Sequence, residues 1–408
     1  MPWEARSIME ERYRFVQLVE SGEYTVSEAC GVFGISRQTG HKWLGRYAGE
    51  GLEGLRDRSR APHGCPHRTS ESTEREILEA WSAHPDWGPR KLRRWWLRRY
   101  RDAEWPAAST VGAALERHGR TRKRRRRPTV VPHPGRPQAE AWGPNELWTS
   151  DFKGEFRTRD GRWCYPLTVA DQCSRFLLGC RALPSTKMTG VRPALQLVFE
   201  EYGLPRAILT DNGPPFSSAA GLGRLSRLSV WWIRLGIVPL LIEPGHPEQN
   251  GRHERMHRTL KPRTRPAAAS CRGQQRIFDR FREEFNVERP HDGLGGRTPG
   301  DVYQASPRTF PRRLPPLEYG SDCEVRKVCG NGCLVWHNEF VFISRVLIGE
   351  YVGLTESGDG IWSVRFGPRL LGKFNERDWS FHPAPVPTAR RALRESSGPA
   401  QSSKELES

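Results

Sequence analysis

The sequence predicts a multidomain protein with an all-α head at the N-terminus, an α/β core and a small all-β barrel near the C-terminus. Three patterns predict this fold class. Residues 1–118 carry apolar side chains at helical spacing, interrupted by short turns. Residues 141–305 alternate strand-like and helix-like stretches, whereas residues 320–382 alternate apolar and polar side chains between glycine turns. With 408 residues, the chain is long enough for two or three domains.

Changes in composition along the chain set the expected domain boundaries. The basic run Arg120–Arg127 and the proline-rich stretch after it separate the head from the core. The last residues are rich in Pro, Ser, Glu and Ala, which is typical of disorder. We therefore expect helical units at 1–60 and 66–118, a basic linker at 119–140, the core at 141–305, the β domain at 320–382 and a disordered tail at 383–408.

The charge balance indicates a polyanionic partner. Lys and Arg number 65 against 47 Asp and Glu, which gives a net charge of +18, and nucleic acid is the polyanion that such a balance favours. No apolar run approaches the ~18 residues that span a bilayer, and acidic residues interrupt the N-terminus where a secretory signal needs an apolar core. The nine cysteines are an odd number, which favours a reducing compartment. We expect a cytoplasmic, nucleoid-associated protein without a membrane partner.

The first 60 residues predict a helix-turn-helix domain. A first helix is expected over residues 6–20, and a second, short helix begins where Ser27 is placed to cap it. Gly34 permits the tight turn, and Ser36 caps the third helix. That helix would present Arg37, Gln38, His41 and Lys42 to a DNA major groove. The alternative is an ordinary helical hairpin.

A second helical unit follows, and the basic run follows that unit. Residues 73–83, 87–100 and 106–119 predict three helices, which we interpret as a second helix-turn-helix-like unit; the alternative is a solvated basic helix packed on the first unit. The run at 120–127, which includes Arg124 and Arg125, has 7 basic residues in 8 and cannot fold alone. We expect it to contact DNA phosphates without sequence choice, the alternative being a solvated linker.

Three acidic residues in the core stand where a metal site would need them. Asp151 ends a predicted strand, Asp211 follows the buried strand of residues 205–210, and Glu254 lies near the start of a helix. Phosphodiester cleavage and strand transfer need a nucleophilic oxygen, an in-line leaving group and charge neutralisation, which two divalent metals can supply. Carboxylate oxygens are suitable ligands for Mg²⁺. The pattern predicts a catalytic metal site at Asp151, Asp211 and Glu254.

The helix that carries Glu254 also carries two cations on the same side. Arg258 and Lys261 lie four and seven residues further on, within about 40° of Glu254 on an ideal helix. They would suit DNA phosphates beside a metal site, whereas the alternative is an ordinary helix salt bridge. Two other acids are alternative ligands. Glu248 lies in the Pro/Gly loop, and Asp171 is interpreted as a turn former or as a hydrogen-bond partner of Arg175.

Three motifs give the core a family resemblance. DFKG at 151–154, LTDNG at 209–213 and HPEQNGRHERMHRTL at 246–260 resemble the catalytic core of insertion-sequence DDE transposases, which are relatives of retroviral integrases, and residues 285–303 resemble the end of that core. The resemblance implies a ribonuclease-H-like fold with a mixed five-stranded sheet. It also implies two Mg²⁺ or Mn²⁺ ions at Asp151, Asp211 and Glu254, 3′-end cleavage and strand transfer, and a homo-oligomer that acts on element ends and target DNA.

One spacing departs from the family pattern. Residues 212–253, 42 in number, separate Asp211 from Glu254, which is longer than is usual in the family. The excess is assigned to residues 217–232, as a harmless insertion or as damage in a decayed copy. The alternative function is therefore a catalytically inactive helix-turn-helix DNA-binding regulator derived from a transposase.

Overall fold

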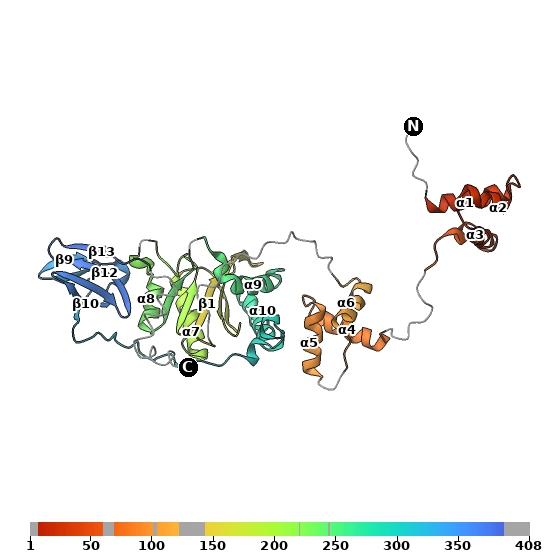
Figure 1. Ribbon diagram of the computed structural model, residues 1–408. Coiled ribbons are helices and arrows are strands. Elements are labelled where there is room, and N and C mark those ends of the chain that lie inside the picture. Colours follow the sequence, from red (N-terminus) through yellow and green to blue (C-terminus); the bar gives the residue numbers. More distant parts are fainter. Residues whose placement is uncertain are drawn as a thin grey trace, which may run out of the picture. The chain divides into compact units, whose positions relative to one another are not determined.

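The computed structural model describes residues 7–59, 69–100, 104–121, 143–219, 221–243 and 245–386. The chain divides into two compact units, residues 1–70 and 71–408 (Figure 1). Arg124 and Arg125, most of the predicted linker and the tail from residue 387 lie outside the described residues. In the part of the chain that is described, no helix is long and apolar enough to cross a membrane.

The first unit is a three-helix domain with the expected tight turn. It contains α1 (Ile8–Glu20), α2 (Val26–Val32), α3 (Arg37–Glu50) and a short 3₁₀ turn, η1 (Gly51–Leu55). Its buried core consists of Phe15, Val16, Ala29, Cys30, Trp43 and Leu55. Gly34 has φ +63°, which suits glycine, and Ser36 caps α3 by accepting a hydrogen bond from the Thr39 backbone N–H.

The cap of α2 differs from the predicted one. Thr25, and not Ser27, caps this helix, because the Thr25 hydroxyl accepts a hydrogen bond from the Glu28 N–H while the Glu28 carboxylate accepts one from the Thr25 N–H. This reciprocal capping box satisfies two backbone N–H groups at once, which a serine inside the first turn cannot do.

The second unit begins with three further helices. They are α4 (Glu71–Ala83), α5 (Pro89–Arg99) and α6 (Ala108–Arg117), close to the predicted spans. Their shared core contains Ile77, Ala80, Trp87, Leu92, Trp105, Val111, Ala114 and Leu115. Ion pairs join these helices to the core domain: Arg98 contacts Asp301, and Arg289 Nη1 lies 3.3 Å from Asp86 Oδ2.

The core domain is built on a mixed sheet, as the sequence predicts. Its five longer strands are β1 (Leu147–Phe152), β3 (Trp163–Asp171), β4 (Leu177–Leu183), β5 (Ala207–Thr210) and β6 (Val238–Leu241), and a two-residue strand, β2 (Phe156–Arg157), also pairs with β3. The order is β4-β3-β1-β5-β6. Strand β1 runs antiparallel to β3 and parallel to β5.

Helices cover both faces of this sheet (Figure 1). Helices α7 (Met188–Tyr202) and α8 (Arg227–Arg234) lie on one face, where Trp148, Phe199 and Trp232 are fully buried. Helices α9 (Gly251–Leu260) and α10 (Cys271–Glu283) lie on the other, where Met256, Leu260 and Phe278 are buried. Because side chains alternate along a strand, Trp148 points to the first face while Thr149 and Asp151 point towards α9.

Short helical turns complete the core and the connection beyond it. They are η2 (Leu222–Arg224), η3 (Pro247–Asn250), η4 (Lys261–Thr264), the π-helical turn η5 (Glu284–Glu288), η6 (Asp292–Leu294), η7 (Pro299–Asp301) and η8 (Arg345–Leu347). Arg308 fixes the segment that leaves the core, because its guanidinium donates to the carbonyls of Pro205, Leu235 and Gly236.

The C-terminal domain is all β, but the predicted barrel is wrong. Strands β7 (Glu324–Lys327), β10 (Tyr351–Gly358), β11 (Ile361–Phe366), β12 (Arg369–Asn375) and β13 (Ser380–Pro383) form an open antiparallel sheet in the order β13-β12-β11-β10-β7. Closure would require β7 to pair with β13. Instead, a separate hairpin of β8 (Cys333–Trp336) and β9 (Glu339–Phe342) packs Leu334 and Trp336 into the core of this domain, which buries the apolar face without closing the sheet.

Residues 217–232 pack against both the core domain and this C-terminal domain. Leu228 and Trp232 pack into the core under the main sheet, whereas Val230 on the other side of α8 packs with the C-terminal strands. Beside them, Arg234 Nη1 lies 2.9 Å from Glu350 Oε2. The segment assigned as an insertion therefore carries apolar side chains that both domains bury.

Candidate active site

Two aspartates lie side by side at one edge of the main sheet. Strands β1 and β5 are parallel neighbours, and Ser150 is paired with Thr210. The residues that come next are Asp151, which is still within β1, and Asp211, the first residue after β5, and they therefore lie at the same level. Neighbouring strands are about 4.8 Å apart, so the two carboxyl groups start from adjacent backbone positions.

Glu254 reaches the same edge from α9. It lies in the first turn of this helix, which is docked on the sheet by two buried histidines, His253 and His257. Burial and then the charges of Asp211 and Glu254 raise the pKa of Asp151, so both acids act on it electrostatically.

The electrostatics of the three acids favour a bound positive charge. Burial, followed by the charges of Asp211 and Glu254, raises the pKa of Asp151 from 3.8 to about 7. Burial also raises the pKa of Asp211, opposed by a hydrogen bond from the Gly213 backbone. In addition, Asp211 Oδ1 is buried without a hydrogen-bond partner. A cation between these oxygens would relieve both the repulsion and the unsatisfied atom.

A buried hydrogen-bond chain behind Asp151 was not anticipated from the sequence. The Thr168 hydroxyl donates to the Asp151 carbonyl oxygen at 2.9 Å, and the Nε2 atoms of His253 and His257 both lie 2.7 Å from that hydroxyl. His253 Nδ1 lies 2.7 Å from the Thr149 hydroxyl. The signal in the sequence was the pair of histidines four residues apart, which share one face of a helix. These contacts fix the rotation of α9 and hence the direction of Glu254.

Two histidines lie beside Asp151, and most of their ring nitrogens are engaged in hydrogen bonds. Asp151, His253 and His257 have ligand atoms within 4.8 Å of one another. However, both nitrogens of His253 are already engaged, and so is Nε2 of His257, which leaves only His257 Nδ1, 3.8 Å from Asp151 Oδ2. Burial lowers the pKa of His257 to about 3, so this imidazole is neutral at pH 7. The oxygen donors of the acids fit a divalent cation such as Mg²⁺, with His257 beside them.

The two rival acids have other partners. The Asp171 carboxylate accepts hydrogen bonds from the backbone N–H groups of Asn145 and Ser174 and from the Ser174 hydroxyl, so it forms a turn, as one interpretation held. Arg175 is not among these partners. Glu248 lies in η3, where its carboxylate is 2.7 Å from His246 Nδ1.

The predicted DNA-contacting side chains that the structure describes are exposed, and one of them caps its helix. Arg37, Gln38, His41 and Lys42 are all exposed on α3. Arg258 is exposed on α9. Lys261 is exposed too, but it begins η4, because Pro262 has no backbone N–H with which to continue the α-helix. Lys261 still has α-helical φ/ψ, and its backbone N–H donates to the His257 carbonyl, so it caps the end of α9.

Comparison with known protein families matches the regions described above. Integrase core domain models match residues 142–247 and 235–299. A helix-turn-helix domain model matches residues 11–63, and a homeodomain-like domain model matches residues 39–115. The chain carries an integrase core domain. This confirms the family resemblance that the three motifs predicted and the mixed α/β core expected from it.

Curated relatives of this integrase-core chain include insertion-element proteins. It is 29% identical over 168 residues to an uncharacterised 39.2 kDa protein of insertion element IS476 from Xanthomonas euvesicatoria, covering 41% of this chain and 46% of the relative. It is 28% identical over 163 residues to an uncharacterised 31.7 kDa protein of insertion element IS407 from Burkholderia multivorans, covering 39% and 55%. The chain thus spans about half the length of these relatives. Among solved structures, the HTLV-2 integrase catalytic core domain in complex with magnesium is 14% identical with a TM-score of 0.31, covering 40% of this chain and all of that one.

Proposed function

We propose that this chain is a DNA transposase that cleaves the 3′ ends of an insertion element and joins them to target DNA by phosphoryl transfer. One observation supports the proposal: in an integrase core domain, Asp151 and Asp211 stand on neighbouring parallel strands beside the helix that carries Glu254, and burial followed by the charges of the other two acids raises the pKa of Asp151. A buried carboxylate that feels the charges of two other acids is typical of a site that is completed by cations.

Each group of residues in the site would have its own role. Asp151, Asp211 and Glu254 would hold two Mg²⁺ or Mn²⁺ ions, which when bound would supply a nucleophilic oxygen and neutralise the leaving group. Thr168 and the two histidines keep α9, and with it Glu254, in register with β1. Arg258 and Lys261 are exposed beside Glu254 and would bind the phosphates that flank the scissile bond.

Recognition of the element ends would come from the head. Arg37 and Gln38 lie at the start of α3, where a recognition helix contacts base edges, and Lys42 would contact phosphate. Arg124 and Arg125 would add contacts that do not depend on sequence. Because two element ends must join one target, we expect a homo-oligomer on double-stranded DNA.

The test is a strand-transfer assay with end-containing oligonucleotides and Mg²⁺ or Mn²⁺. Asp211→Asn should reduce the rate by ~10³-fold or more, since removal of a metal ligand weakens transition-state stabilisation by several kcal/mol. Asp279→Asn is the matched control, because Asp279 is an exposed acid on α10, and it should retain the rate. Full activity of Asp211→Asn would refute the site. Wild-type chain that retards DNA without cleaving it would support the inactive regulator instead.

A further inference from the structure

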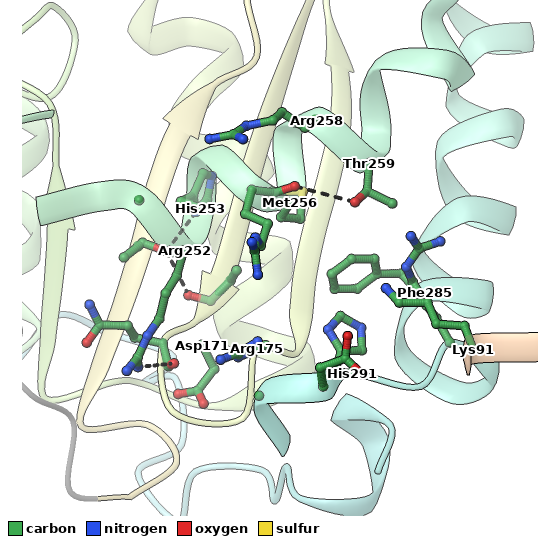
Figure 2. Close-up of a pocket in the computed structure, with 18 residues that line it drawn as sticks. Lys91, Asp171, Arg175, Arg252, His253, Met256, Arg258, Thr259, Phe285 and His291 are labelled. Atoms are coloured by element: carbon green, nitrogen blue, oxygen red, sulfur yellow. Dashed lines mark hydrogen bonds between the residues drawn. The ribbon is translucent and has the colours of Figure 1, made fainter. Parts of the chain in front are cut away.

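A basic pocket lies beside α9, the helix that carries Glu254. It has a volume of about 690 Å³, and it lies between α9, the turn after β3 and the segment after α10 (Figure 2). Its lining includes six basic side chains, namely Lys91, Arg175, Arg252, Arg255, Arg258 and Arg289. At ~30 Å³ for each water molecule, the cavity has room for ~20 waters, more than a single phosphate group needs.

The positive charge of this pocket is only partly neutralised by the protein, since Arg289 is paired with Asp86. Among the described residues, Arg175, Arg252, Arg255 and Arg258 form no ion pair. Of the two acids in the lining, Asp171 is bound by backbone N–H groups and Ser174, and Asp292 is paired with Arg94. Burial and then the charges of Arg252 and Arg255 lower the pKa of Arg175. Like charges gathered in a cavity without counter-ions favour an anionic ligand.

Two further features indicate that the pocket is a specific binding site. Arg175 lies directly across Gly293, where a Cβ would come 2.0 Å from its Nη2 atom, so the absence of a side chain at 293 lets the guanidinium reach the cavity. His291, which is only 9% exposed, also lines the pocket, and its Nε2 atom is buried without a hydrogen-bond partner. An unsatisfied buried polar atom at a cavity wall calls for a ligand or water.

We propose that this pocket binds phosphate groups of the DNA strand that also occupies the carboxylate site. Guanidinium groups match phosphate oxygens in a bidentate fashion. Thr149 lines the pocket and lies two residues from Asp151 on the same face of β1, so the pocket reaches the strand that carries Asp151.

The position of the pocket on α9 explains how one strand reaches both sites. Each residue turns the helix by about 100°, which places Arg255 about 100° from Glu254 and Arg258 about 40° from it. Arg258 therefore lies between the helix face of Glu254 and the helix face of Arg255, and it also lines the pocket. A strand that passes over Arg258 would continue towards Arg255 and Arg252. The assignment of DNA as the source of phosphate rests on the proposed function.

The first experiment measures DNA affinity without catalysis. Binding of the full chain to a labelled duplex of about 30 base pairs is measured in EDTA between about 50 and 200 mM salt. Arg255→Gln should lower the slope of log K against log salt by about 0.9, and Arg252→Gln with Arg255→Gln by about 1.8. Arg276→Gln on the exposed face of α10 is the control and should leave the slope unchanged. Slopes equal to that of the control would overturn the proposal.

The second experiment locates the contact and identifies the source of the phosphate. Phenylglyoxal modification of the wild-type chain is followed at each arginine by mass spectrometry, with duplex DNA, with inorganic phosphate or with neither. We expect DNA to protect Arg175 and Arg255 but not Arg276. Protection by inorganic phosphate and not by DNA would assign the pocket to a free anion and overturn the DNA assignment, and no protection would overturn the site. Because neither experiment uses metal, both outcomes are independent of the Asp211→Asn result.

Discussion

Replacement of Asp151 by asparagine should stabilise the metal-free protein at pH values above about 4, where an aspartate in the unfolded chain is ionised. The pKa of Asp151 is about 7 in the folded chain, against 3.8 for an unperturbed aspartate. Between these values the folded state keeps a proton that the unfolded state has lost, so the free energy of unfolding falls as pH rises. At 1.36 kcal/mol for each pKa unit, the whole loss is about 4 kcal/mol.

The asparagine side chain cannot ionise, so the Asp151→Asn variant avoids this loss. Urea unfolding in EDTA should give equal stabilities for wild type and Asp151→Asn near pH 4, and the variant should become more stable by up to about 4 kcal/mol at pH 7 and above. Asp279→Asn should show no such trend, because Asp279 is exposed on α10. A difference between Asp151→Asn and wild type that does not change with pH would refute the electrostatic account of the site.

Addition of a metal ion should have the opposite effect on the free energy of unfolding. Mg²⁺ at about pH 8 should raise the free energy of unfolding of the wild type, because a ligand that binds only the folded state stabilises it. The effect should be small in Asp151→Asn, which lacks one carboxylate. An equal effect of Mg²⁺ on both proteins would mean that Asp151 is not a ligand.

Three further predictions concern residues that support the sites. Gly40→Ala should destabilise the first unit by about 1–3 kcal/mol and weaken DNA binding, as measured by thermal unfolding and DNA retardation, because a Cβ there would lie 2.5 Å from Cys30 Sγ; unchanged melting of that unit would contradict the packing. Thr168→Val should lower the free energy of urea unfolding by about 2–4 kcal/mol, since it leaves two buried imidazole nitrogens without a partner, and a loss below that of a surface Thr→Val control would count against the hydrogen-bond chain. Phe199→Ala should lower it by about 3–5 kcal/mol, because this ring is fully buried under the main sheet; a loss below about 1 kcal/mol would contradict that burial.

The sequence by itself determined the parts of the protein that depend on local pattern. Gly34 and Ser36 identified the turn and the cap of α3, because both effects act within a few residues. The motifs around Asp151, Asp211 and Glu254 identified the integrase core. An apolar/polar alternation placed the strand that carries Asp151, and a buried β-branched run placed the strand before Asp211. Element ends were less accurate where two local signals competed, as they did at Thr25 and Ser27 and at Lys261 before Pro262.

Only the tertiary structure decided how distant segments meet. The parallel pairing of β1 with β5 puts Asp151 beside Asp211, and the packing of α9 adds His257 and Thr168 behind them. The β8–β9 hairpin leaves the C-terminal sheet open, and residues far apart in the sequence surround the basic pocket. Such contacts depend on which apolar surfaces are buried together, and this is a property of the whole chain that no local spacing of residues encodes.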